Sequence, residues 1–178
     1  MRIISGQCRG RYLPQPPNGF KARPTTDFAK ENLFNILENF FDLATVDVLD
    51  LFAGTGGISC EFASRGSLSV DAVEIENIHF NYIKKTVKLL ELNQIHVIRN
   101  DVFRFLEFCK KKYDIIFADP PYSSDRIRHI PLSVAENRLL KPDGLLAVEH
   151  PSTVDFEKTV GFFKRKSYGS VNFSFFRF

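Results

Sequence analysis

From Val46 onward, short apolar segments alternate with segments of helical periodicity, and this alternation is the strongest constraint on the fold. The apolar segments are rich in β-branched and aromatic residues, as buried strands are. Strands that alternate with helices predict a mostly parallel sheet with helices on both faces. We expect strands at residues 46–51, 69–74, 95–99, 113–118 and 144–149.

The segments between these strands have the apolar stripes of amphipathic helices. We expect helices at 27–41 and 77–92, a third that opens at Asp101, and a fourth over 131–140. Thr26 or Asp27 can cap the first helix and Asn77 the second. The stripes predicted to face inward are Ala29, Leu33, Ile36, Leu37 and Phe40 in the first helix, and Phe80, Ile83, Val87 and Leu90 in the second.

Both ends of the chain have a different pattern. The final 18 residues, GFFKRKSYGSVNFSFFRF, form two aromatic runs joined at Tyr168-Gly169, which predicts an antiparallel hairpin at the edge of the sheet. Residues 2–6 and 9–14 predict a small hairpin at the start. The expected fold class is α/β: a doubly wound, Rossmann-like sheet with a C-terminal antiparallel hairpin, preceded by a small β-hairpin and helix.

A chain of 178 residues with 44% hydrophobic content fits one soluble domain, residues 1–178. No apolar run approaches the length of a membrane span, and the N-terminus lacks a signal-peptide pattern, so we expect a cytoplasmic protein. The three cysteines are widely spaced without a CxxC pair, which predicts reduced thiols and no zinc site. The four histidines are scattered, and we expect no metal.

Positive charge is concentrated at the N-terminus. Residues 1–30 hold six basic residues and one acid, a net charge of +5 in a chain whose total is +3. We therefore divide the chain into a basic arm, residues 1–26, and a catalytic core, residues 27–178. Such an arm suits a polyanionic partner.

The first strand runs into DLFAGTGGIS, where Gly54, Gly56 and Gly57 allow a tight turn before a helix. Glu74 ends the second strand and can accept hydrogen bonds from both hydroxyls of a ribose. A glycine loop with such an acid predicts a nucleoside-binding site at the carboxyl ends of the strands. The alternative is a turn that needs glycines for its geometry alone.

The glycine spacing does not match the dinucleotide fingerprint. The sequence GxGxxG would place glycine at position 59, where this chain has Ser59. Asp50, two residues before Phe52, suits a ligand that carries an ammonium group better than a pyrophosphate.

The fourth strand ends abruptly in FADPPY. A residue that precedes proline is held extended, and prolines have no N–H, so Asp119, Pro120 and Pro121 form a stiff turn that offers acceptors. Hydrogen bonds to the Asp119 carboxylate and the Pro120 carbonyl can hold the exocyclic amine of a base in line for attack. Tyr122 offers a face for a flipped base. The alternative is a proline-terminated strand with no chemistry.

These motifs resemble those of class I S-adenosylmethionine-dependent amino-methyltransferases: DLFAGTGGIS, Glu74, Asp101 in NDVF, and DPPY at 119–122. The flanking segments RIISGQCRGRYLP and RPTTDFAKENLFNIL resemble the N-terminal hallmarks of the bacterial 16S ribosomal RNA guanine-N2 methyltransferase family, the RsmD type. The resemblance covers nearly the whole chain. It implies a class I methyltransferase fold and methyl transfer to guanine N2 in 16S RNA.

The resemblance also implies roles for individual residues. Asp50, Phe52, Gly54 and Gly56 would lie at the methionine end of S-adenosylmethionine, Glu74 at its ribose, and Asp101 with Val102 at its adenine, with Asp119 also beside the cofactor. Asp119, Pro120, Pro121 and Tyr122 would hold the guanine. Arg9, Arg11, Lys21 and Arg23 would contact the RNA backbone.

The chain departs from the family pattern in the first helix, where relatives commonly have TTDRVRE. Here the sequence is TTDFAKE, so Phe28 replaces one basic residue and Lys30 the other. The expected partner is 16S RNA within an assembling small subunit, bound by a monomer. One alternative is adenine-N6 methylation of DNA, against which the chain has no inserted domain large enough to read bases in the major groove. The others are methylation of a protein glutamine and a role as a non-catalytic RNA-binding assembly factor.

Overall fold

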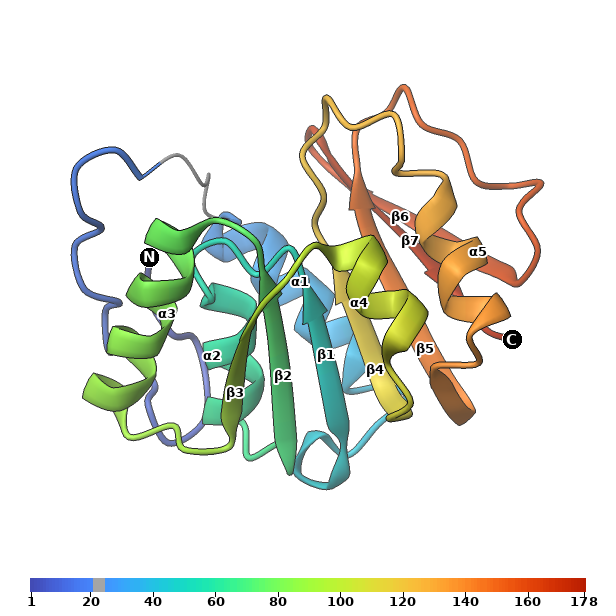
Figure 1. Cartoon of the computed structure of the whole chain (residues 1–178). Helices are drawn as coiled ribbons and strands as arrows, with labels where there is room; N and C mark the ends of the chain where they lie inside the picture. Colours follow the sequence, from blue (N-terminus) through green and yellow to red (C-terminus); the bar gives the residue numbers. More distant parts are fainter. Residues whose placement is uncertain (21–24) are drawn as a thin grey trace.

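The computed structural model describes residues 1–20 and 25–178, and in these residues one seven-stranded sheet forms the centre of the molecule (Figure 1). The strand order is β3-β2-β1-β4-β5-β7-β6. The first five strands pair in parallel, and β7 and β6 are antiparallel. The strands are β1 Asp47–Leu51, β2 Ser69–Glu74, β3 Ile95–Arg99, β4 Tyr113–Ala118, β5 Leu140–His150, β6 Phe162–Tyr168 and β7 Val171–Phe176.

Helices cover both faces of the sheet, as the alternating pattern predicts. They are α1 Asp27–Leu37, α2 Gly57–Ser64, α3 Asn77–Leu90, α4 Val102–Phe108 and α5 His129–Glu136, with a short 3-10 turn, η1, at Leu43–Thr45. Apolar residues of α1, α2 and α3 pack on one face. Residues of α4 and α5 pack on the other, in front of β4 and β5 in Figure 1.

Three of the expected strands have their predicted bounds, and the differences elsewhere have local causes. Strand β5 begins at Leu140 rather than 144, because Leu140 pairs with Tyr113 before an irregularity in the register. Helix α1 ends at Leu37, four residues early. Helix α5 covers 129–136 rather than 131–140. The C-terminal hairpin turns between Tyr168 and Val171 as predicted.

Helix capping follows the sequence prediction at two of three helices. The Thr26 hydroxyl accepts a hydrogen bond from the Ala29 amide, and Asp101 Oδ1 accepts one from the Arg104 amide. The prediction that Asn77 caps α3 is wrong, because Glu76 occupies that position. Asn77 lies in the first turn, where its Oδ1 accepts a hydrogen bond from Arg99 instead.

The predicted inward stripes of α1 and α3 are partly wrong. In α3 the buried side chains are His79, Tyr82, Ile83, Thr86 and Leu90, while Phe80 and Val87 are half-buried. The stripe is rotated because the N-terminal segment covers this side: Phe20 packs on His79 and Tyr82, and Tyr82 donates to the Pro14 carbonyl at 2.7 Å. In α1, Ile36 is half-buried, and Phe40 lies beyond the helix end and is exposed.

The small N-terminal hairpin forms as predicted, with a bridge between Arg2 and Tyr12, and it is fastened to α2. Glu61, fully buried on α2, accepts the amides of Ile4 at 2.8 Å and Ser5 at 3.0 Å. These bonds satisfy backbone donors that the hairpin itself leaves unpaired. A side chain of α2 therefore fixes the position of the arm.

Lys30 is the second anchor of the arm. Its side chain is fully buried, its Nζ donates to the Arg2 carbonyl, and it lies 3.4 Å from Glu61 Oε2. Arg65 Nε adds a hydrogen bond to Glu61 Oε1 at 2.9 Å. Lys30 is one of the six basic residues among positions 1–30, but its buried ammonium group holds the arm in place and adds no charge to the surface.

Within residues 1–20 and 25–178, the helices are all too short or too polar to cross a lipid bilayer.

We predict that Glu61→Gln destabilises the protein by about 3 kcal/mol, because it removes the buried counter-charge of the Lys30 ammonium and leaves only the partly exposed Asp27 carboxylate at 4.0 Å. Urea denaturation of both proteins measures this difference. The control is Glu31→Gln, at the exposed residue that follows Lys30 in the sequence, which should change stability little. Equal stability of the two variants would contradict the anchoring role of Glu61.

Candidate active site

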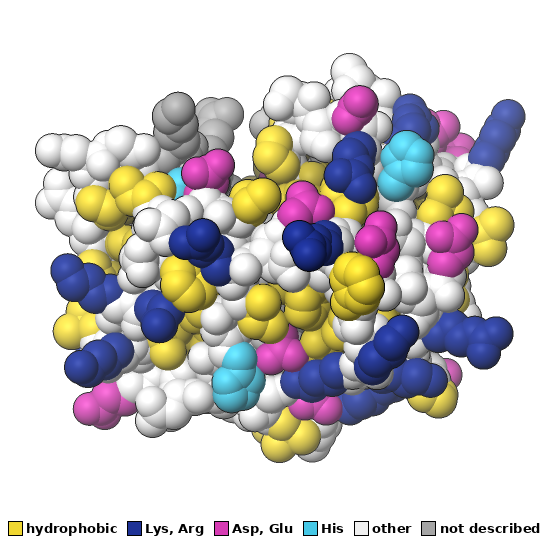
Figure 2. All heavy atoms as spheres, in the orientation of Figure 1, with side chains coloured by type: hydrophobic (Ala, Val, Ile, Leu, Met, Phe, Trp, Pro, Cys, Tyr) yellow, Lys and Arg dark blue, Asp and Glu magenta, His cyan; other side chains and the backbone are white. Residues whose placement is uncertain are grey.

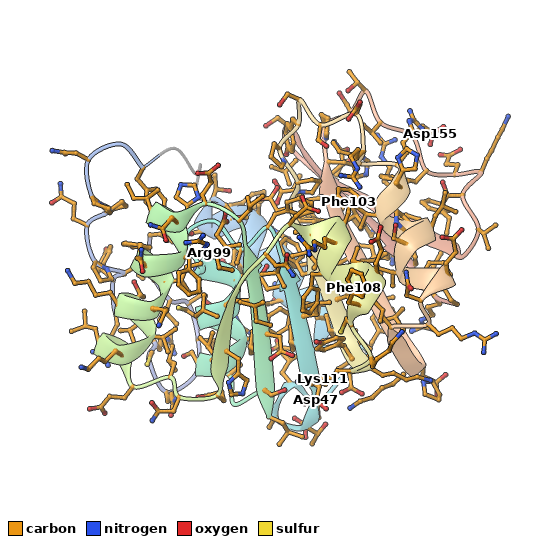
Figure 3. The ribbon with its side chains drawn as sticks, viewed as in Figure 1. Asp47, Arg99, Phe103, Phe108, Lys111 and Asp155 are labelled. Atoms are coloured by element: carbon orange, nitrogen blue, oxygen red, sulfur yellow. The ribbon has the colours of Figure 1, made fainter. Side chains whose placement is uncertain are left out.

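The carboxyl ends of β1, β2, β4 and β5 meet at one edge of the sheet, where the predicted cofactor and substrate motifs come together. Figure 3 labels Arg99 and Phe103 close to this edge and Asp47 and Lys111 at the opposite one. Ligands of open α/β sheets bind outside the carboxyl ends of the strands, where neighbouring connections diverge. The strand order diverges at β1, which lies between β2 and β4.

The glycine loop has the strained backbone that the sequence predicts. Phe52, Gly54 and Gly56 all have positive φ, at 62°, 55° and 68°. Gly56 opens α2, and a Cβ placed on it would lie 3.0 Å from the Ile83 side chain. Both the left-handed backbone and the close approach of α3 therefore require glycine at position 56.

Glu74 ties this loop to the end of β2. Its Oε2 accepts the Gly54 amide and its Oε1 the Glu76 amide, both at 2.8 Å, and His79 Nδ1 lies 3.7 Å away. The carboxylate is buried and fixed in place beside the loop. Its role at a ribose stays a prediction.

Asp50 is buried at the base of the loop and pairs with Ser59. It accepts hydrogen bonds from the Ser59 amide at 3.1 Å and from the Ser59 hydroxyl. Burial raises the pKa of Asp50 to about 7, and the Glu74 carboxylate adds to this rise, whereas the bonds from Ser59 oppose it. The serine that breaks the dinucleotide fingerprint is thus the hydrogen-bond partner of this acid.

The DPPY turn lies directly beside the loop. The Asp119 amide donates to the Leu51 carbonyl at 3.3 Å, so the turn begins against the end of β1. Burial, then the negative charges of Glu149 and Asp50, raise the pKa of Asp119 well above its usual value. Pro120 is buried and Pro121 exposed.

Tyr122 is partly exposed to solvent, and its hydroxyl is hydrogen-bonded to the buried Glu149. The side chain is 46% exposed, and the hydroxyl donates to Glu149 Oε1 at 3.0 Å. The ring can therefore offer a stacking face to a base while its hydroxyl is held by Glu149. The stacking of a base on Tyr122 stays a prediction.

Glu149 is the site residue that sequence reasoning missed. It ends the fifth expected strand and is 5% exposed, next to Asp119 across the β4–β5 pairing. Burial raises its pKa, and the bond from Tyr122 opposes this rise. The available signal was an acid at the carboxyl end of a fully apolar strand, the same signal that selected Glu74.

Asp101 and Val102 stand at the start of α4, beyond the end of β3. One Asp101 oxygen caps the helix, and Val102 is buried beneath it. Phe103 follows, with its ring 6.3 Å from that of Phe52 and the Arg126 guanidinium 3.5 Å over its centre. The start of α4 and the glycine loop thus share an aromatic contact.

The two predicted RNA-contacting arginines that the structure describes, Arg9 and Arg11, belong to the N-terminal hairpin, whereas Phe20, further along the arm, packs on His79 beside Glu74. Arg9 and Arg11 are exposed, and the Arg11 guanidinium donates to the Leu89 carbonyl at 3.2 Å, at the C-terminal end of α3. That end lies away from the glycine loop (Figure 1). Lys21 and Arg23 lie outside the described residues. Figure 2 shows further cationic side chains over α3, where Lys84, Lys85 and Lys88 are exposed.

In the part of the chain that the structure describes, no group of three or more His, Cys, Asp or Glu side chains is arranged to hold a metal ion.

Comparison with known proteins gives one family and a consistent fold. Residues 1–177 match the family model described as "Conserved hypothetical protein 95". The Haemophilus influenzae protein named ribosomal RNA small subunit methyltransferase D is 35% identical over 153 residues, which cover 84% of this chain and 78% of the relative. A solved structure of a hypothetical protein from Thermus thermophilus aligns with a TM-score of 0.87 and 25% identity, over 100% of this chain and 99% of that one.

A more distant methyltransferase, solved as a complex with SAH, has the same fold. It is 16% identical with a TM-score of 0.66, over 83% of this chain and 49% of that one. The expected fold class is confirmed: the sheet is that of class I methyltransferases, with an antiparallel C-terminal hairpin.

We predict that the stability advantage of Asp50→Asn over the wild-type protein grows between pH 4 and pH 7. The Asp50 carboxyl ionises near pH 3.8 when unfolded but near 7 when folded, so rising pH favours the unfolded wild-type chain across this window. The advantage should grow by up to about 4 kcal/mol and be constant above pH 7. Urea denaturation at each pH measures it, with exposed Asp125→Asn as control. A constant difference throughout would contradict the raised pKa.

Proposed function

The chain belongs to the RsmD-type family of ribosomal RNA methyltransferases, and we propose that it transfers a methyl group from S-adenosylmethionine to the exocyclic N2 amine of a guanine in 16S RNA. The observation that carries the proposal is the contact between the two motifs. The Asp119 amide binds the Leu51 carbonyl at 3.3 Å, which brings the DPPY turn against the strand that leads into the glycine loop. A methyl donor and an amine held there are within reach of each other.

The cofactor end has groups that fit S-adenosylmethionine. Asp50 is a buried carboxylate whose pKa of about 7 falls when a cation comes close, so an ammonium group would be stabilised there. In the proposal, Phe52, Gly54 and Gly56 line the methionine end, Glu74 holds the ribose, and Asp101 with Val102 holds the adenine. When bound, this cofactor would supply a methyl group on a sulfonium, and the C–S electron pair would remain on the neutral thioether of S-adenosylhomocysteine, which is a good leaving group.

The substrate end orients the amine. The Asp119 carboxylate and the Pro120 carbonyl accept hydrogen bonds from the two N2–H groups, which aims the nitrogen lone pair at the methyl carbon. Tyr122 stacks on the base, and Pro121 keeps the turn stiff. Once N2 carries the methyl group, one N2 proton must leave. Asp119 is placed to accept it, and its raised pKa favours acceptance.

The RNA itself is larger than the site, so contacts can extend over the surface. We propose that residues 1–26 act as the RNA-binding arm, with Arg9 and Arg11 on phosphates remote from the reacting base. Residues 27–178 form the catalytic core of the same domain. The proposed partner is 16S RNA in an assembling small subunit in the cytoplasm, bound by a monomer.

The test is a methyl-transfer assay with labelled S-adenosylmethionine on three substrates: small subunits from cells that lack the enzyme, naked 16S RNA, and duplex DNA. Digestion and nucleoside identification then name the product. We expect N2-methylguanosine in ribosomal samples only. Methyladenine in DNA would favour the adenine-N6 alternative, and cofactor binding without transfer would favour the assembly factor.

In the same assay, Asp119→Ala should lower kcat by about 100-fold, because the amine loses the acceptor that aligns it. Binding of S-adenosylhomocysteine, measured by calorimetry, should survive, since Asp50 and the glycine loop are intact. Asp125→Ala is the matched control, an exposed acid six residues further along. Normal turnover by Asp119→Ala would refute the role of the turn.

Arg9→Ala should reduce the slope of log affinity against log salt by about one, the effect of one lost phosphate contact. Turnover at saturating RNA should be unchanged, because Arg9 lies away from the reacting end. Filter binding at several salt concentrations measures the slope. The control is Lys110→Ala, an exposed cation after α4, on the other face of the sheet. Identical slopes for the two variants would remove Arg9 from the RNA interface.

A further inference from the structure

One oxygen of Glu149 is buried without a partner. Tyr122 donates to Oε1 at 3.0 Å, whereas Oε2 accepts no hydrogen bond from any residue that the structure describes. The side chain is 5% exposed, so bulk water does not satisfy this oxygen. A buried acceptor in this state is unfavourable, and in a binding site it indicates a ligand donor.

Glu149 lies beside the proposed acceptor of the amine. Phe117 pairs with Ala147 in the register of β4 and β5, and both side chains face the core beneath α1, α2 and α3. Two residues further along, Asp119 and Glu149 continue the same face. Neighbouring strands are about 4.8 Å apart, so the two carboxyl groups can meet adjacent atoms of one base.

The acidic groups at this edge of the sheet also favour a ligand that brings a hydrogen-bond donor. Asp119 and Asp50 are close enough to influence each other, and Glu149 raises the pKa of Asp119. The charged neighbours that act on Asp119 at this edge are both acids, and the Tyr122 hydroxyl donates to Oε1 rather than to Oε2. A polarised N–H group would complete this arrangement.

Guanine has such a group next to its amine. Its Watson–Crick edge carries the N1–H donor beside the N2 amine, whereas N1 of adenine is an acceptor. We propose that Glu149 Oε2 accepts the N1–H of the target guanine, while Asp119 and Pro120 hold N2, and that Glu149 thereby selects guanine. This inference rests on the proposed function and adds the residue that determines its base specificity.

Tyr122 has a second role in this arrangement. Its hydroxyl fixes Oε1 and so keeps the carboxylate from rotating, while its ring stacks on the same base. The bond therefore links recognition of the base edge to recognition of its face. Glu149 and Tyr122 act as one unit, and the carboxylate is the member that distinguishes between bases.

The test uses 2-aminopurine, which keeps the 2-amino group but has no proton on N1. Once the modified guanine is located, 16S RNA is prepared by splinted ligation with guanine or 2-aminopurine at that position. The wild-type enzyme should prefer guanine in kcat/KM by at least about tenfold. Glu149→Gln should reduce this preference by about tenfold, because an amide can accept from N1–H or donate to an unprotonated N1.

The comparison of preferences isolates the N1 contact. 2-Aminopurine also lacks the guanine O6, but this loss is common to both enzymes and cancels in the ratio. Glu157→Gln, an exposed glutamate near the end of β5, is the matched control and should keep the wild-type preference. S-adenosylhomocysteine binding checks that Glu149→Gln is folded.

Two results would overturn the inference. One is equal use of guanine and 2-aminopurine by the wild-type enzyme, which needs no variant and so holds even if Glu149→Gln fails to fold. The other is a folded Glu149→Gln enzyme that is slower on both bases by the same factor, which would give Glu149 a structural role only. Failure of the proposed function is a separate outcome, namely no N2-methylguanosine from the wild-type enzyme.

Discussion

The position of β1 between β2 and β4 is the constraint on which the site depends. Asp50 pairs with Ala72 on one side and Phe117 on the other, so the glycine loop, Glu74 and the DPPY turn must all leave the sheet at one edge. The Asp119 amide then binds the Leu51 carbonyl, and Glu74 binds the Gly54 amide. The predicted cofactor and substrate motifs, distant in sequence, are brought together by backbone pairing and by the Glu74 side chain.

The cost of this arrangement is electrostatic. Asp50, Asp119 and Glu149 are acids gathered at one edge of the sheet, and burial raises the pKa of each. Like charges in a dry environment oppose folding, so the cluster is not explained by stability. In the proposed function each acid has a donor to meet: an ammonium group, an amine and a ring N–H. The cluster is the kind of local conflict that functional sites retain.

The buried ion pair of Lys30 and Glu61 shows why charge counts near a terminus can mislead. The sequence places Lys30 among six basic residues and cannot show that Glu61, 31 positions later, binds both its ammonium group and the hairpin amides. Residues 1–20 of the arm are held against α2 by this pair, and Arg11 is bound at the C-terminal end of α3. In the proposed function, the RNA contacts of Arg11 would therefore lie away from the reacting base.

Strand positions and motif order could be predicted from the sequence because they depend on local pattern. The alternation of apolar and helical segments predicted the strands at residues 69–74, 95–99 and 113–118. The spacing of the glycines predicted the loop, and the stiffness of the two prolines predicted the turn. Resemblance to a known family predicted S-adenosylmethionine as the cofactor and guanine as the target base. Packing between distant segments decided the rest. Phe20 packs on His79, so the buried face of α3 differs from the predicted one. Asn77 accepts a hydrogen bond from Arg99 and does not cap α3, and the β4–β5 register brings Glu149 beside Asp119. These outcomes depend on which surfaces meet, and a linear pattern carries no record of that.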